Sequence, residues 1–204
     1  MNTNSNVYTI IYTAIIVVVV AAVLSFAAMA LKPMQTANVK ADTISQIMAA
    51  AQIGTKAELS SIGNDAVLTK YSEQIAEAFA VNTAGEKVKD LGVSKSGIEL
   101  IDNFKPQDLA IKAGADAVLP VYVFKSGITV IPVYGAGLWG PVWGYVALQP
   151  DCRTIAGAYF DHASETPGLG AKIKDDPSFQ AEFIGKKLNL DDPANPFDIL
   201  KGGA

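Results

Sequence analysis

The sequence predicts an α+β protein with one N-terminal transmembrane helix, followed by a single domain with an antiparallel sheet and flanking helices. Three observations carry this prediction. None of the 16 basic and 20 acidic side chains precedes Lys32, so the first segment is uncharged. Two stretches with helical spacing of apolar residues come next, and short runs rich in Val, Ile, Tyr and Phe follow from Ala117. Helices, then strands, then a helix, without regular βαβ alternation, are typical of the α+β class.

The 25 residues from Val7 to Leu31 form the uncharged segment. As a helix they would extend roughly 37 Å, more than the roughly 30 Å of a bilayer's hydrocarbon core. Tyr8 and Tyr12 lie near its first end, where amphipathic rings prefer the membrane interface. Lys32 and Pro33 end the run. We therefore expect a transmembrane anchor over residues 1–33 and one domain over residues 34–204.

A cleaved signal peptide is the alternative interpretation of this segment. Ala28-Met29-Ala30 resembles a small-x-small cleavage site. However, residues 1–6 contain no Lys or Arg, and the apolar run is longer than a signal peptide's hydrophobic region. An uncleaved anchor is favoured. Lys32 and Lys40 place the nearby positive charge on the domain side, which by charge alone favours a cytoplasmic domain.

Composition excludes several classes of function. The net charge of −4 is unsuited to a nucleic-acid partner, because neutralising phosphates requires a basic face. Cys152 is the single cysteine, so neither an internal disulfide nor a multi-cysteine metal site is possible in this chain. His162 is the single histidine, which excludes a multi-histidine metal site.

Periodicity places the elements of the domain. Apolar residues at helical spacing predict helices over residues 38–53 and 65–81, joined to the rest by a polar connection over residues 84–97. A change to short β-branched and aromatic runs separated by turn residues predicts an antiparallel meander. A loop over residues 161–170 and a helix over residues 177–188, with Pro177 in its first turn, complete the domain. The predicted strands are Val118–Phe124, Ile128–Tyr134, Val142–Leu148 and Thr154–Phe160.

Two segments are candidates for a binding site. Tyr134–Gly144 holds four glycines and both tryptophans of the chain. Glycine allows backbone N–H groups to approach a ligand, and a neighbouring tryptophan can cover a flat ring. A glycine-rich hairpin with its tryptophans in the core is the purely structural alternative. No phosphate-binding loop is indicated, because no helix follows the glycines.

The second segment, Asp161–Gly170, combines Glu, Thr, Pro and two glycines around one leucine. Ser164 lies near His162, but the Gly-x-Ser-x-Gly elbow of a hydrolase is missing, so acyl chemistry is disfavoured. We expect His162 to be a hydrogen-bonded structural residue. No residue is predicted to be catalytic or to bind a metal.

These segments carry a resemblance to a known family. The chain is similar to the C subunits of the sodium-translocating NADH:quinone oxidoreductases, an FMN-binding family related to the G subunits of Rnf electron-transport complexes. The resemblance covers nearly the whole chain, and its two glycine-containing loop motifs are specific when taken together. The matching stretches are the anchor with residues 31–38, Ile131–Gly144, His162–Gly170 and Phe183–Lys187.

The resemblance implies an FMN-carrying electron-transfer subunit of a membrane-bound, sodium-translocating NADH:ubiquinone oxidoreductase complex. Other membrane subunits and the lipid bilayer are the implied partners. The implied location is the bacterial inner membrane, with the domain on the periplasmic side, which overrides the charge argument above. The implied cofactor-binding residues are Leu138, Trp139, Gly140, Glu165, Thr166, Gly168, Leu169 and Gly170.

The C-terminal end departs from the family pattern. Family members attach FMN through its phosphate to a threonine in a Ser-Gly-Ala/Gly-Thr-type motif near the C-terminus. No threonine follows Thr166 here, and no serine follows Ser178. We therefore expect the domain to be truncated before the acceptor, which would lie beyond Ala204. Alternatives are an Rnf-type G subunit, a membrane-anchored structural protein without flavin, and an anchored module that binds a small aromatic ligand.

Overall fold

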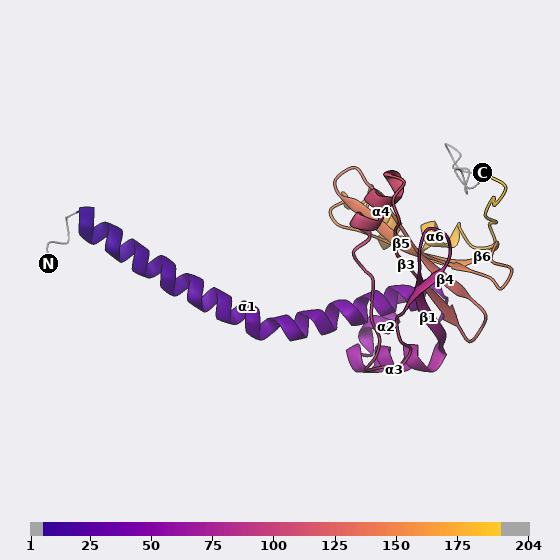
Figure 1. Cartoon of the computed structure of the whole chain (residues 1–204), viewed down its shortest axis with the longest axis horizontal. Coiled ribbons are helices and arrows are strands. Elements are labelled where there is room, and N and C mark those ends of the chain that lie inside the picture. The colour runs from indigo at the N-terminus through magenta and orange to yellow at the C-terminus, as the bar shows by residue number, and fades with distance from the viewer. Residues whose placement is uncertain (1–5, 193–204) are drawn as a thin grey trace. The chain divides into compact units, whose positions relative to one another are not determined.

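The structure is a computed structural model that describes residues 6–192 (Figure 1). The chain divides into two compact units, Met1–Lys40 and Ala41–Ala204. The helices are α1 (Asn6–Ala50), α2 (Lys56–Ser61), α3 (Asn64–Gln74), α4 (Phe104–Lys112), α5 (Lys172–Asp175) and α6 (Pro177–Ala181). The strands are β1 (Ile75–Val81), β2 (Lys87–Asp90), β3 (Leu119–Phe124), β4 (Thr129–Ala136), β5 (Pro141–Leu148) and β6 (Ile155–His162).

Helix α1 is continuous through Pro33, whereas the sequence predicted an apolar helix ending there and a separate helix over residues 38–53. An interior proline lacks one backbone donor and its ring crowds the preceding turn, which favours a helix end or a kink, but the helical residues on both sides of Pro33 continue the element through it. Within residues 6–192, α1 is the one helix long and apolar enough to cross a membrane, with a mean hydropathy of 2.9 over its most apolar window.

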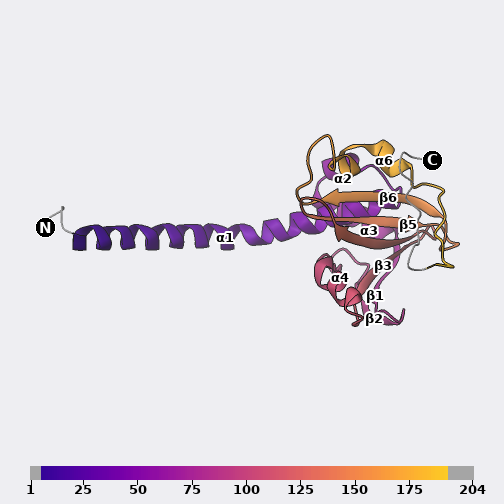
Figure 2. The same ribbon diagram turned by 90° about the horizontal axis from the view of Figure 1, so that it is seen from above.

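The domain contains one six-stranded antiparallel sheet with strand order β2-β1-β3-β4-β5-β6. This confirms the predicted α+β class, and β3 to β6 match the four predicted strands to within two residues at each end. Figure 2 shows β6 with α6 beside it at one end of the sheet and β2 at the other end.

The predicted helix over residues 65–81 is wrong in its second half. Helix α3 ends at Gln74, and Ile75–Val81 form strand β1, which pairs with both β2 and β3. Alanine and glutamate favour a helix locally, but the ladder bonds on two sides and burial of Ile75, Ala78 and Ala80 outweigh that preference. Strand β2 lies inside the predicted polar connection. All four of its side chains are exposed, so its sequence lacks the alternation of apolar and polar residues that predicts a strand.

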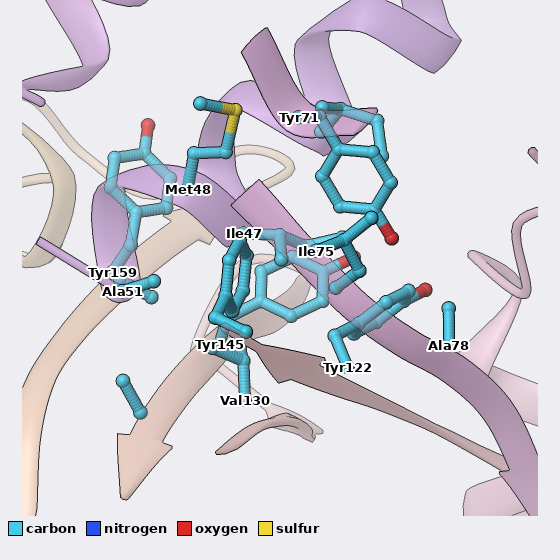
Figure 3. Close-up of a cluster of buried hydrophobic side chains, with 14 of the residues drawn as sticks. Ile47, Met48, Ala51, Tyr71, Ile75, Ala78, Tyr122, Val130, Tyr145 and Tyr159 are labelled. Carbon is cyan, nitrogen blue, oxygen red and sulfur yellow. The ribbon is translucent and has the colours of Figure 1, made fainter. Parts of the chain in front are cut away.

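The main core lies between the sheet and the last turns of α1, with α3 and α4 contributing to it. Figure 3 shows Ile47 of α1 close to the aromatic side chains of Tyr122 and Tyr145. The rings of these two tyrosines meet edge to face, with centroids 6.5 Å apart. Burial raises the pKa of both phenols, which keeps them neutral inside the core.

A smaller apolar cluster, built on Val146, Leu148 and Ile155, is closed by the C-terminal segment. Helix α6 ends at Ala181, so the predicted helix over residues 177–188 is too long. Backbone bonds to the start of β6 explain the early end: Ile155 N donates to Lys186 O at 2.8 Å, and Leu188 N donates to Arg153 O at 2.9 Å. The predicted extended tail, residues 191–204, lies largely outside the described residues.

Candidate functional site

Two loops meet at one rim of the sheet. The first, residues 137–140, joins β4 to β5 and is closed by a bond from Gly137 N to Gly140 O at 2.8 Å. The second starts where β6 ends, and His162 is the register partner of Val142 in β5. Two antiparallel strands therefore return the chain to the same edge, as the spacing of the two motifs predicted.

Side chains of the second loop hold the first loop in place. The backbone N–H of Trp139 donates to Glu165 Oε1 at 3.0 Å. The hydroxyl of Ser164 donates to the carbonyl of Trp139 at 2.7 Å, so both backbone groups of this residue are bonded to the second loop. A backbone bond from Ala163 N to Pro141 O, 3.0 Å long, continues the contact toward the sheet. The tip of the hairpin is therefore fixed against the second loop.

His162 orders the second loop. Its Nδ1 accepts the backbone N–H of Glu165 at 3.1 Å, which turns the chain directly after β6. The predicted hydrogen bonding of this histidine is observed. The carbonyl of Thr166 accepts the N–H groups of Leu169 and Ala171, each at 3.1 Å, so the loop closes on itself before α5.

Two glycines make room for the Glu165 carboxylate. A Cβ on Gly137 would lie 2.3 Å from Glu165 Oε1, and a Cβ on Gly170 would lie 2.6 Å from Oε2. Any larger residue at either position would displace the carboxylate. Gly168 has a different requirement, because its φ of +75° lies in the left-handed region although nothing lies within 4 Å of its Cβ position.

A groove of about 420 Å³ opens beside the Glu165 carboxylate. This volume lies within the range of small-molecule sites, which are mostly apolar with a few placed polar groups. The aromatic ring of Phe160 and several Cβ-free backbone positions suit a flat conjugated ring such as the isoalloxazine of FMN. The lining residues are Val133, Tyr134, Gly135, Ala136, Gly137, Leu138, Val142, Trp143, Phe160, Glu165, Gly170 and Ile173.

Three of the eight predicted residues line the groove, and five lie outside its lining. Leu138, Glu165 and Gly170 line the groove. The exposed side chains of Trp139 and Leu169, with exposed fractions of 66% and 73%, do not line it. The remaining three, Gly140, Thr166 and Gly168, lie in the loops outside the lining.

Sequence reasoning missed three aromatic residues of the groove. Tyr134 and Trp143 were inside the candidate segment, and they are register partners on β4 and β5, but neither was assigned a role. Phe160 is the last residue of a predicted strand and pairs with Gly144 across the β5–β6 ladder. A Cβ added to Gly144 would lie 2.7 Å from the Phe160 ring. Alternation separates these residues: Tyr134 and Trp143 lie on the face that packs on α1, whereas Phe160 lies on the opposite face with Val133.

Fold and groove together define an α+β domain with a ligand-sized groove at the rim of an antiparallel sheet. Residues 137–199 match the family model described as the FMN-binding domain. The chain is 31% identical to the C subunit of the Na⁺-translocating NADH-quinone reductase of Vibrio campbellii, over 89% of this chain and 73% of that protein. It is also 31% identical to the C subunit of Neisseria meningitidis serogroup A, over 88% of this chain and 71% of that protein. The C subunit of Vibrio anguillarum is 40% identical over 88 residues, 41% of this chain and 34% of that protein.

Solved structures agree with these relatives. The C subunit from Parabacteroides distasonis superimposes with a TM-score of 0.61 at 36% identity, over 78% of this chain and 70% of that one. NqrC of Shewanella oneidensis superimposes with a TM-score of 0.56 at 25% identity, over 81% of this chain and 79% of that one. The chain belongs to the NqrC family, the C subunits of the Na⁺-translocating NADH-quinone reductases. The predicted family is confirmed, and an Rnf-type G subunit is not favoured.

Proposed function

We propose that this chain is the FMN-carrying electron-transfer subunit of a membrane-bound Na⁺-translocating NADH-quinone reductase. The observation that carries the proposal is the groove of about 420 Å³, whose residues from Gly137 onward fall within the match to the FMN-binding domain. When bound, FMN supplies the redox chemistry, and the protein supplies binding, orientation and the electrostatic environment.

The residues of the groove suit these tasks. Phe160 offers apolar ring surface that excludes water from a bound aromatic plane. The Glu165 carboxylate holds the hairpin tip in place, and Gly135, Gly137 and Gly170 leave the backbone bare of side chains along the groove. Leu138, Trp139 and Leu169 are exposed apolar side chains around it that we assign to covering the ring. Gly140, Thr166 and Gly168 shape the two loops.

Titration of the 204-residue chain in detergent with FMN tests the proposal. We expect saturable binding that quenches flavin fluorescence, because aromatic side chains in van der Waals contact with the ring quench its excited state. Phe160→Ala should weaken binding. Leu109→Ala is a control, since this exposed leucine lies on α4 outside the groove. A parent chain that binds no FMN would contradict the proposal and favour a flavin-free structural role.

We further propose that covalent attachment requires a threonine beyond Ala204, because no threonine follows Thr166 in these 204 residues. Denaturing electrophoresis under ultraviolet light should then show no fluorescent band for the 204-residue chain after expression with the flavin-attaching machinery. A chain continued through a Ser-Gly-Ala-Thr-type motif should give a fluorescent band. Fluorescence of the 204-residue form would identify another residue as the acceptor.

Helix α1 and the membrane complex of the relatives favour a membrane-anchored protein. We propose that residues 1–33 form the anchor in the bacterial inner membrane, with the lipid bilayer and the other subunits as partners and the domain on the periplasmic side. Residues 34–204 expressed alone should be soluble and folded, whereas the full chain should require detergent. A full chain that fractionates as a soluble protein would argue against the anchor.

The single cysteine offers a direct test of sidedness. Cys152 is exposed in the turn between β5 and β6. A membrane-impermeant maleimide added to intact spheroplasts should label it if the domain is periplasmic. Cys152→Ser is the control for specificity. Labelling that appears only after the membrane is permeabilised would place the domain in the cytoplasm.

A further inference from the structure

One charged side chain lines the groove. Among the described residues of the lining, Glu165 is the only aspartate, glutamate, lysine or arginine. The rest of the lining is apolar, aromatic or free of side chains, around a volume of about 420 Å³. In a cleft with low-dielectric walls, charge of one sign dominates the electrostatic potential. The interior of this groove is therefore negative.

The two loops fix the position of this carboxylate. Its Oε1 accepts the backbone N–H of Trp139 at 3.0 Å, and the backbone N–H of Glu165 donates to His162 Nδ1 at 3.1 Å. The two carboxylate oxygens occupy the space that side chains at Gly137 and Gly170 would fill. Both glycines line the groove themselves. The carboxylate therefore lies at the wall of the groove.

No basic side chain offsets the charge of Glu165. Within residues 6–192, no lysine or arginine forms an ion pair with it. Two lysines flank the lining residue Ile173 in sequence. Lys174 is paired with Asp161 at 2.8 Å, and Lys172 is exposed and outside the lining. The backbone N–H that Glu165 accepts stabilises the carboxylate but adds no net positive charge to the groove.

This charge matters because reduction adds negative charge to a flavin. FMN that takes up two electrons and one proton carries one more negative charge on its ring than oxidised FMN does. A neighbouring carboxylate repels that added charge and has little effect on the uncharged oxidised ring. Charge near the ring nitrogens is one means by which a protein tunes a flavin. A bound ring also displaces water from the groove, which weakens the screening of this repulsion.

We propose that the Glu165 carboxylate lowers the midpoint potential of the flavin in the groove, because it makes reduced FMN bind less tightly than oxidised FMN. The inference rests on the proposed function, since it assumes that the groove takes FMN. At a separation of roughly 10 Å and an effective dielectric constant of about 20, one unit charge changes the ratio of the two affinities by roughly tenfold. For a two-electron couple, a tenfold ratio corresponds to about 30 mV.

Two variants of the full chain separate the charge of Glu165 from its hydrogen bond. Glu165→Gln keeps the length and an acceptor oxygen but removes the charge. Glu165→Asp keeps the charge but is one methylene shorter, which weakens the bond to the N–H of Trp139. Glu73→Gln is the control, because it removes the same charge at an exposed position on α3, outside the groove.

The measurement is the two-electron midpoint potential of bound FMN. Each chain is saturated with FMN in detergent at mildly alkaline pH and reduced anaerobically with dithionite against a dye of known potential. We expect Glu165→Gln to raise the midpoint by about 30 mV. Glu165→Asp should stay close to the parent, and Glu73→Gln should match it. A purely structural role of Glu165 predicts the opposite order, because the shorter side chain would then disturb the site more than glutamine does.

Two results would overturn the inference: an unchanged midpoint in Glu165→Gln, or an equal shift in Glu165→Asp and Glu165→Gln. If Glu165→Gln does not fold or does not hold FMN, Leu138→Lys and Leu138→Gln decide the matter. Leu138 also lines the groove, so a lysine there should offset the carboxylate and raise the midpoint above that of the glutamine variant. Equal midpoints in these two variants would overturn the inference as well.

Failure of the inference differs from failure of the proposed function. A parent chain that binds no FMN contradicts both together. A parent chain that binds FMN, with the same midpoint potential as the Glu165→Gln chain, contradicts the inference only.

Discussion

The carboxylate of Glu165 accepts the backbone N–H of Trp139 across a separation of 26 residues, with a distance of 3.0 Å. This bond joins the tip of the β4–β5 hairpin to the loop that follows β6. Neither loop has a hydrophobic core of its own, and Leu138, Trp139 and Leu169 all project into solvent. The positions of the two loops relative to each other therefore depend on hydrogen bonds between them.

Glu165→Ala should weaken FMN binding roughly tenfold, because a hydrogen bond to a charged acceptor contributes about 1.5–3 kcal/mol. Glu165→Gln keeps an acceptor oxygen and should lose less affinity. Fluorescence titration with FMN measures both variants, and thermal unfolding should show a smaller effect than binding does. Parent-like affinity in Glu165→Ala would show that the bond between the loops is unimportant for the site.

Gly168→Val should destabilise the domain by about 1–2 kcal/mol or more, since its φ of +75° is unfavourable for L-residues and especially for β-branched ones. The cost is conformational, because a Cβ here meets nothing within 4 Å. Gly168→Asn should cost less, as asparagine tolerates this region. Thermal unfolding of both variants measures the difference, and equal stability of the two would contradict a conformational cause.

Leu169→Ala should leave stability almost unchanged, because the side chain is 73% exposed and buries little apolar area on folding. Its effect should appear in FMN affinity and in the midpoint potential of the bound flavin, through loss of apolar cover. Leu190→Ala, at a 51% exposed position outside the groove, is the matched control. An unchanged potential and affinity in Leu169→Ala would remove this residue from the site.

Asp151 should contribute pH-dependent stability at the β5–β6 turn. The Thr154 hydroxyl donates to Oδ2 at 2.5 Å, and the N–H groups of Thr154 and Arg153 donate to Oδ1 at 2.8 and 2.9 Å. These bonds lower the pKa of the carboxyl from 3.8 to about 2, so the charged form is favoured by folding. The contribution is present above pH 3.8 and is lost as the pH falls toward about 2.

Asp151→Asn tests this dependence. At neutral pH its melting temperature should lie below that of the parent chain, and the gap should close between about pH 4 and pH 2. Thr154→Val, which removes the hydroxyl donor, should show the same convergence. A gap that stays constant over this interval would mean that ionisation of Asp151 does not contribute to stability.

Much of the molecule followed from local pattern. The uncharged run from Val7 to Leu31 determined a helix long enough to span a membrane, because length and hydropathy are properties of the segment alone. Alternation and turn residues determined β3 to β6. Since two strands separate the two loop motifs, antiparallel pairing also determined that the loops meet at one rim.

Tertiary structure decided the rest, because those features depend on partners distant in sequence. Ile75–Val81 became a strand through ladders to β2 and β3, against the helix preference of its alanines. Residues 185–188 left the helical path because the start of β6 offered them backbone partners. Gln46 looked like one polar position on a helix, and only folding brought Trp143, 97 residues away, within reach of its amide. Local periodicity reports which face of an element is apolar, but a hydrogen bond across the domain exists only once the whole sheet has formed.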